Sequence, residues 1–392
     1  MSDSTVGKRI AAQRKIARFT QAKLGRVAGY STSMVSKVEQ GREAPSDGFV
    51  AAVARALDTA PERLTGGPPW TVIEEDGPLE GIGELRAILA EGQYVTATEP
   101  PPLAHLAAGM DAIDLAYRND QGRVAMAQLP AVLRALYGAL HAAPADHRAP
   151  VYTLLAAAYY TAQRLLRRFG FLSLVPTALD RLDWSSADAD DPLYAALAKV
   201  ERARILMYHD GGELGMRLVE QSLDLIEGAT PGANAVRGFA HLSGSVVAAR
   251  GLRPGIAAEH IAHARELAPL MHGESDLYGT LFGPANVGIH ACAVALESGE
   301  PDRAAREGAA LVLPPGLAPP RAGHHWQDVA RANLLAGRPG DALIALRRAR
   351  EVAPQQTRLH PSVRETYLGI VAAERRRSES TGAFGAWLRI TP

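Results

Sequence analysis

The chain has 392 residues, which predicts two to three domains, and its 47% hydrophobic and 21% charged content is typical of a globular protein with a large core. The single cysteine, Cys292, excludes an intramolecular disulfide. No run of 18 uncharged apolar residues is present, and the first residues lack the apolar core of a signal peptide, so we expect a cytoplasmic protein without a membrane span.

The formal net charge of zero hides an asymmetry. Residues 1–64 carry 11 Lys and Arg against 6 Asp and Glu, whereas the rest of the chain carries 31 against 36. A basic N-terminal unit on a slightly acidic body predicts that nucleic acid is bound at one end of the molecule only.

Two short helices joined by a tight turn are predicted within residues 20–41. Leu24, Val27 and Ala28 recur at helical spacing and predict an apolar stripe on the first helix. Gly29 is expected to end that helix, and Ser31 to cap the next one through its hydroxyl. In the second helix we expect Met34, Val35 and Val38 to face inward, and Thr32, Ser33, Ser36 and Lys37 to face outward.

This stretch resembles the helix-turn-helix of the phage-repressor (Xre/Cro-like) family over residues 6–64. The residues that carry the resemblance are Arg14, Gln21, Leu24, Gly29, Ser31, Val35, Ser36, Val38, Glu39, Gly41, Pro45 and Ser46. The resemblance implies a bundle of about five helices whose recognition helix spans residues 31–40. It also implies an ion pair between Arg14 and Glu39. The DNA-contacting residues that we predict are Gln21, Ser31, Thr32, Ser33, Ser36, Lys37, Gln40 and Arg42.

Three residues depart from the family pattern. Gly25 stands where alanine is usual, which should destabilise its helix by roughly 0.5–1 kcal/mol. Tyr30 replaces a small β-branched residue in the turn. Arg18 stands where glycine usually closes the first helix, so we expect it to adopt a left-handed backbone conformation.

The remaining N-terminal elements follow from periodicity. A first helix is predicted over residues 6–18 and a fourth over 46–57, opened by Pro45 and Ser46. Residues 66–83 are rich in Gly and Pro and predict a linker, in which Trp70 is expected to dock on a neighbouring domain. A helix with Leu85, Ile88 and Leu89 on one face is predicted to follow.

Helical repeats are predicted beyond the linker. Turn signals centred on Gly170, Gly211, Gly251, Gly299 and Gly337 recur every 38 to 48 residues, and small residues follow them. The segment 332–342 resembles the turn of a tetratricopeptide (TPR) repeat, although the period is longer. The predicted fold is therefore all-α, with an N-terminal five-helix helix-turn-helix bundle followed by an α-solenoid of TPR-like helical hairpins. The C-terminal segment 377–392 lacks a core pattern and is predicted to be either disordered or docked through Phe384 and Trp387.

Polar and aromatic residues inside the repeat helices are candidates for an effector site. Phe282, Asn286 and His290 are spaced by four, which predicts one shared helix face, and an amide there can pair with an extended peptide. Packing is the competing interpretation for all such residues, and we favour it for Tyr159 and Tyr160. The predicted ligand-binding residues are Tyr278, Phe282, Asn286, His290, His324 and Arg331.

No catalytic motif was found, and we expect neither enzymatic activity nor a cofactor. His260 and His263 could form one edge of a metal site, but two ligands are insufficient, so no metal is predicted. Cys292 is interpreted as a small buried apolar residue.

The sequence therefore predicts a DNA-binding domain at residues 1–65, a linker at 66–83, a TPR-like effector and dimerisation domain at 84–376 and a tail at 377–392. The favoured function is a transcription regulator that binds double-stranded DNA as a homodimer and senses a peptide or small-molecule effector. Two alternatives stay open. The first is a protein-interaction scaffold with only incidental DNA binding, and the second is a helical domain that holds a small hydrophobic effector without any peptide role.

Overall fold

The computed structural model describes residues 6–43, 45, 47–59, 61–65, 77–207, 212–374 and 378–390. These residues form helices and connecting loops, and their one β-type contact is an isolated antiparallel bridge between Ser275 and Phe282. The fold is all-α, as predicted. Among the described helices, none has the length and the apolar run that a bilayer span requires.

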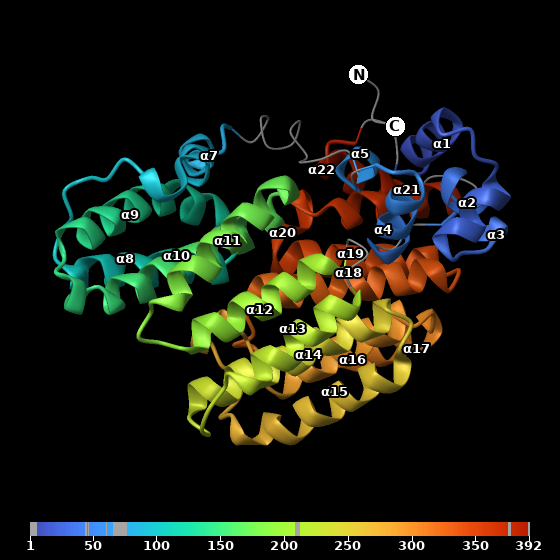
Figure 1. Cartoon of the computed structure of the whole chain (residues 1–392). Helices are drawn as coiled ribbons and strands as arrows, with labels where there is room; N and C mark the ends of the chain where they lie inside the picture. The colour runs from blue at the N-terminus through green and yellow to red at the C-terminus, as the bar shows by residue number, and fades with distance from the viewer. Residues whose placement is uncertain are drawn as a thin grey trace.

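The N-terminal unit is a small bundle with its own hydrophobic core (Figure 1). Its helices are α1 (Val6–Ile16), α2 (Gln21–Ala28), α3 (Thr32–Glu39), α4 (Asp47–Ala56) and α5 (Pro61–Thr65). Leu24, Val35, Val38 and Phe49 are almost completely buried at its centre. The five predicted helices are therefore confirmed.

One inward assignment in this bundle is wrong. Val27 is 53% exposed, whereas its stripe partners Leu24 and Ala28 are buried. The eight-residue helix α2 buries only a narrow face, and residue 27 is displaced by about 60° from residue 24 around the helix axis. The proposed cap at Ser46 and the docking of Trp70 concern positions outside the described residues.

Beyond the linker, α7 (Ile82–Glu91) buries Leu85, Ile88 and Leu89, as predicted. A series of helical hairpins follows it (Figure 1). The first helices of the hairpins are α8 (Leu103–Arg118), α10 (Ala149–Arg168), α12 (Leu193–Leu206), α14 (Pro231–Arg250), α16 (Pro284–Glu297) and α18 (Pro319–Leu335). Their partners are α9 (Gly122–Ala142), α11 (Val175–Ala187), α13 (Gly212–Asp224), α15 (Pro254–Leu267), α17 (Pro301–Ala310) and α19 (Pro339–Val352).

The stacking of these hairpins defines an inner layer of helices. Each first helix packs against the first helix of the next hairpin, from α8 to α10 and onward to α16 and α18. The second helices pack mainly against their own partners and the following first helix. This is the geometry of an α-solenoid of TPR-like hairpins, because each unit buries its apolar face only against its neighbours.

Five of the turns inside the hairpins share one backbone conformation, and the turn predicted at Gly211 lies outside the described residues. At Gly170, Gly299 and Gly337 φ is 80°, 83° and 75°, and the N–H of the next residue bonds to a carbonyl five residues earlier, as in a Schellman motif. Asp120 and Leu252 occupy the same position in two other hairpins, with φ of 61° and 57°. The turn predicted around Gly251 therefore exists, but its left-handed residue is Leu252.

This assignment predicts that Leu252→Gly stabilises the protein. Leu252 is 80% exposed, so the substitution removes little buried apolar surface. A non-glycine residue in the left-handed region costs about 1–2 kcal/mol, and we expect the free energy of unfolding to rise by about 1 kcal/mol. Urea unfolding followed by tryptophan fluorescence measures this change. Leu214→Gly, at a 42% exposed position within α13, is the control and should be destabilising instead.

The solenoid curls back so that its last helices contact its first hairpin. The carboxylate of Asp120, between α8 and α9, accepts the backbone N–H groups of Gln355 and Gln356 at 2.8 and 3.0 Å. These groups begin helix α20 (Pro354–Leu359), whose Leu359 is buried in the core of the early hairpins. The superhelix is thus tied across 235 residues of sequence.

The C-terminal segment is helical and docked. Helix α21 (Pro361–Ala373) is followed by α22 (Glu379–Trp387), capped by the Ser378 hydroxyl. Phe384 is 2% exposed, and the Tyr367 hydroxyl donates to the carbonyl of Thr381 at 3.0 Å. Of the two alternatives for the tail, docking is therefore the one that the described residues 378–390 show.

Candidate functional site

Helix α3 presents a polar surface at the outside of the N-terminal bundle. Its cap is the predicted one, because the Ser31 hydroxyl accepts the backbone N–H of Met34 at 3.1 Å. Val35 and Val38 are buried, whereas Thr32, Ser33 and Lys37 are exposed. The predicted residues Ser31, Gln40 and Arg42 are also exposed, and Gln21 and Ser36 are half-buried beside them. The structure therefore brings all eight predicted residues together on or next to one helix.

At Gly25 the backbone of α2 lies very close to the backbone of the turn that leads into α3. A Cβ atom on Gly25 would lie 2.7 Å from the carbonyl oxygen of Tyr30, so alanine at this position would force the turn to shift. Glycine here permits a tight turn rather than merely loosening α2. The Tyr30 ring then packs edge-on against Phe49 with 4.9 Å between centroids, which anchors the turn to α4.

An ion pair fixes α3 to α1, as the resemblance implied. The Arg14 guanidinium donates to both carboxylate oxygens of Glu39 at 2.6 and 2.8 Å, and the Gln21 amide donates to the same carboxylate at 2.8 Å. Burial disfavours the charged Glu39, but the hydrogen bonds from Arg14 and Gln21 outweigh it and hold the pKa of Glu39 below its ordinary value. Arg18 has the left-handed backbone that the sequence predicted, with φ of 56°.

Two polar side chains of the surface are engaged within the domain. Lys37 Nζ lies 3.4 Å from Glu43 Oε2 and keeps its side chain 56% exposed. The Gln40 amide donates to the Ser36 hydroxyl at 3.0 Å. Both contacts are solvent-accessible, so another polar partner could replace them at a low energetic cost.

Two of the predicted effector residues, Tyr278 and Phe282, lie before the start of α16. Tyr278 lies in a short 3-10 turn (Leu277–Gly279) with φ of 55°, and its hydroxyl donates to Asp191 at 2.7 Å. Phe282 is fully buried over Gly238 and precedes α16, so the prediction that it shares a helix face with Asn286 and His290 is wrong. The helix begins only at Pro284 because Glu274 caps it by accepting the N–H groups of residues 285 and 286.

Asn286 and His290 lie on α16 and meet a residue that the sequence analysis missed. Arg321, in the first turn of α18, donates from Nε to Asn286 Oδ1 at 2.6 Å, and its Nη2 lies 3.1 Å from His290 Nδ1. Arg321 stands three residues before His324, so the helical spacing of these two residues was the available signal. Arg331 lies further along α18 and pairs with Glu297 at 3.1 Å.

His260, one of the two histidines considered as possible metal ligands, contacts a histidine of another helix. His241 on α14 places its Nδ1 3.0 Å from that of His260 on α15. Burial and the neighbouring imidazoles lower the pKa of His241 to about 4, so His241 is neutral at physiological pH. Among the side chains that the structure describes, no group of three or more His, Cys, Asp or Glu is arranged to hold a metal ion.

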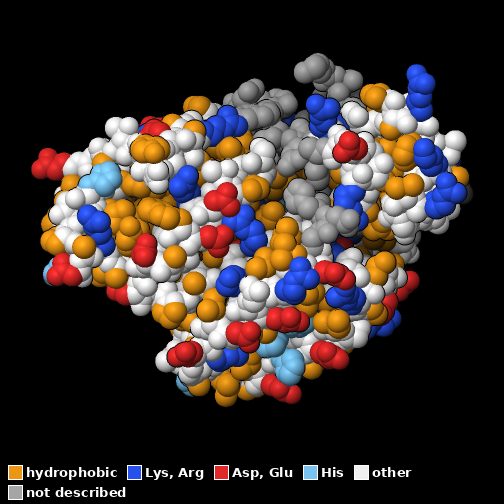
Figure 2. Space-filling view, in the orientation of Figure 1, with side chains coloured by type: hydrophobic (Ala, Val, Ile, Leu, Met, Phe, Trp, Pro, Cys, Tyr) orange, Lys and Arg blue, Asp and Glu red, His pale blue; other side chains and the backbone are white. Residues whose placement is uncertain are grey.

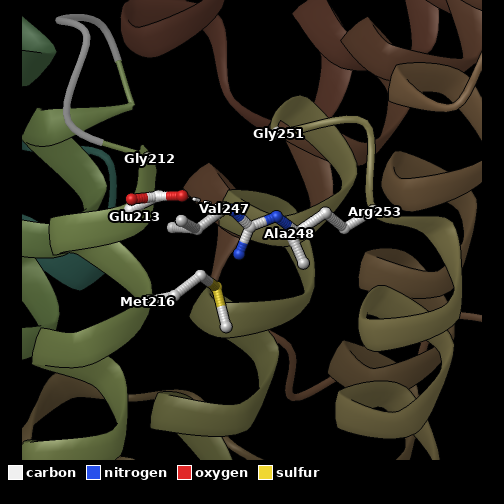
Figure 3. A pocket seen from close by; sticks show the side chains of 7 residues that line it. All are labelled: Gly212, Glu213, Met216, Val247, Ala248, Gly251 and Arg253. Carbon is white, nitrogen blue, oxygen red and sulfur yellow. Dashed lines mark hydrogen bonds and ion pairs between the residues drawn. The ribbon is translucent and has the colours of Figure 1, made fainter.

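A pocket of about 310 Å³ lies elsewhere, beside the start of α13 (Figure 3). Met216, Val247 and Ala248 form its apolar wall, and the Arg253 guanidinium lies 3.4 Å from Glu213 at its rim. None of the predicted effector residues lines this pocket.

Comparison with known proteins identifies the N-terminal unit. Residues 5–65 match the family model of a helix-turn-helix domain. No curated protein sequence matches the chain. The crystal structure of Bacillus thuringiensis PlcR in complex with the peptide PapR7 and DNA is similar over 79% of this chain and 94% of that chain, with 12% identity and a TM-score of 0.38. A likeness this low carries no role over to this chain. What the comparisons establish is that residues 5–65 form a helix-turn-helix domain.

Proposed function

We propose that the protein is a transcription regulator that binds double-stranded DNA through α3. One observation carries the proposal: the exposed hydroxyl and lysine surface of α3 is held rigidly by the Arg14–Glu39 pair and by the close turn at Gly25. Hydroxyls and a lysine match the acceptors and donors of base edges and phosphates. Together with the basic charge of residues 1–64, this supports a helix-turn-helix domain of the phage-repressor type.

We further propose that the protein acts as a homodimer and that its repeat domain senses a peptide or small molecule. A single helix-turn-helix module reads about half a turn of DNA, and two-fold operators require two modules. A hydrogen bond of 3.4 Å from the Val6 N–H in α1 to Glu365 in α21 joins the DNA-binding domain to the end of the solenoid. A change in the repeats could act on α1 through this contact. The proposal assigns the protein no enzymatic reaction.

Lys37→Ala is expected to weaken binding to the operator by about 1–3 kcal/mol and to relax sequence preference, because it removes a side chain directed at base edges. The family resemblance implies that Gln21 contacts a phosphate, and a phosphate contact carries no sequence information, so Gln21→Ala should weaken binding to matched and scrambled DNA more equally. Gel-shift titrations on an operator found by genome-wide mapping of bound DNA measure both effects. Lys199→Ala on α12 is the charge-matched control. Equal losses on matched and scrambled DNA for Lys37→Ala would remove Lys37 from base readout.

The same assays separate this function from the alternative of an interaction scaffold. A regulator protects a discrete duplex site in footprinting, with an affinity that falls steeply with salt concentration. A scaffold with incidental DNA binding would give weak, salt-labile retention and no footprint.

A further inference from the structure

Arg321 lies on the inner layer of the solenoid with neutral hydrogen-bond partners. Its Nε donates to Asn286 Oδ1 at 2.6 Å, and its Nη2 lies 3.1 Å from His290 Nδ1. Within the described residues, no carboxylate lies within 4.0 Å of its guanidinium, and its Nη1 has no hydrogen-bond partner. The side chain is half-buried, so it is largely desolvated and still reaches solvent.

Several other arginines of the inner layer have carboxylate partners, whereas Arg168 and Arg237 donate to backbone carbonyl oxygens instead. Arg204 and Arg167 lie 2.8 Å from Glu201, and Arg164 lies 3.8 Å from Asp114. A desolvated guanidinium is costly unless an anion compensates it. Burial is the main reason why the pKa of Arg321 falls to about 10; the charge of Arg204 lowers it further, and the carboxylates of Asp328 and Glu274, which lie beyond ion-pair distance, raise it. Arg321 is therefore charged at neutral pH, in surroundings that on balance disfavour that charge.

Asn286 holds Arg321 in place. Its side chain is 2% exposed, its Nδ2 donates to the carbonyl of Leu281 at 2.8 Å, and its Oδ1 accepts from Arg321. Both ends of the amide are therefore bonded within the protein. The helical spacing predicts that this amide pairs with a peptide backbone, whereas in the structure it orients the Arg321 cation.

We infer that Arg321 is the anchor of an oxyanion site on the inner layer, which takes a carboxylate or phosphate group of the effector. The N–H groups of Nη1, which have no hydrogen-bond partner within the described residues, and the second N–H of Nη2 can donate two parallel hydrogen bonds to such a group. His290 and His324 stand beside the site, and the imidazole of His324 acts electrostatically on that of His290. The site rests on the proposed effector role only in one respect, which is that anion binding at Arg321 should alter DNA binding. Anion binding itself can be measured whether or not the protein binds DNA.

Thermal unfolding of the full-length protein in sodium chloride, phosphate and acetate, at matched ionic strength and pH 7, tests the site. For the wild type, phosphate, acetate or both should raise the unfolding midpoint above that in chloride by about 2 °C when the anion reaches roughly ten times its dissociation constant. A response to acetate alone identifies a carboxylate site, and a response to phosphate alone identifies a phosphate site.

The variant Arg321→Gln keeps a donor for Asn286 and removes the charge, so the difference between anions should disappear. Its unfolding midpoint in chloride should equal or exceed that of the wild type, because a desolvated charge without an ion-pair partner has been removed, whereas the loss of a purely structural arginine would lower the midpoint. Arg303→Gln, at a half-exposed arginine of α17, is the charge-matched control and should retain the anion response.

Two results would overturn the inference. One is an equal anion response in the wild type and in Arg321→Gln, which would mean an adventitious ion only. The other is the absence of any response in the wild type up to about one hundred millimolar, a result that does not depend on whether the variant folds. Footprinting on the same samples is independent: a footprint without an anion response rejects this site alone, and an anion response without a footprint rejects the proposed function alone.

Discussion

Glu39→Gln is expected to destabilise the helix-turn-helix domain by about 2–4 kcal/mol, because it leaves the Arg14 guanidinium uncompensated in a site where the two side chains are only 12% and 5% exposed. The new amide NH₂ would also face the donors of Arg14 and Gln21, which now bond to the carboxylate. A domain of about 60 residues has little stability in reserve, so the loss should also abolish the DNA footprint.

Hydrogen exchange of the α3 amides in the full-length protein measures this change as a fall in their opening free energy. Glu43→Gln removes the exposed partner of Lys37 and is the control, with an expected effect below about 1 kcal/mol. The pKa of Glu39 is lower in the folded state than in the unfolded state. Its contribution is therefore complete above the unfolded value near pH 4.3 and is lost as the pH falls through the lower folded value. The opening free energies of the α3 amides in wild type and variant should converge at that low pH. Unchanged protection of these amides in the variant at pH 7 would contradict the role of the Arg14–Glu39 pair.

Glu201→Gln is expected to lower the free energy of unfolding of the repeat domain by about 3–5 kcal/mol. Glu201 on α12 is 1% exposed and pairs with Arg167 on α10 and with Arg204, each at 2.8 Å. One carboxylate thus compensates two guanidinium groups and joins two neighbouring hairpins. A glutamine can accept from only one of them and brings no charge, so both cations lose their compensation.

Urea unfolding followed by the fluorescence of Trp184 and Trp326 measures this effect. Glu213→Gln is the matched control, because Glu213 is 78% exposed and its pairing with Arg253 at 3.4 Å is accessible to water. Its expected effect is below about 1 kcal/mol. Similar midpoints for the two variants would show that water reaches Glu201 and that the pair is not a structural link.

The N-terminal domain was predictable in detail because its signals are local. The Ser31 cap depends only on the residues next to it. The Arg14–Glu39 ion pair joins two residues that belong to the same short sequence motif. The hairpins were predictable where glycine occupies the left-handed position of the turn. The first hairpin was missed because Asp120 takes that conformation without glycine, and the long-range contacts of Asp120 with α20 stabilise it there.

The candidate effector site shows the opposite case. Helical spacing grouped Phe282 with Asn286 and His290, but a cap supplied by Glu274 delays the start of α16 and leaves Phe282 in the core. The contact of Asn286 with Arg321 joins residues 35 positions apart on different hairpins. No periodicity within one helix contains that information.

The sequence by itself determined the all-α fold, the helix-turn-helix domain and the positions of most hairpin turns, because apolar periodicity, caps and glycine turns act within a few residues. The tertiary structure alone decided which polar side chains of different hairpins meet, and so that Arg321 meets an amide and an imidazole within the described residues and no carboxylate. That outcome depends on how the hairpins stack and on the curvature of the solenoid, which arise from the packing of the whole array.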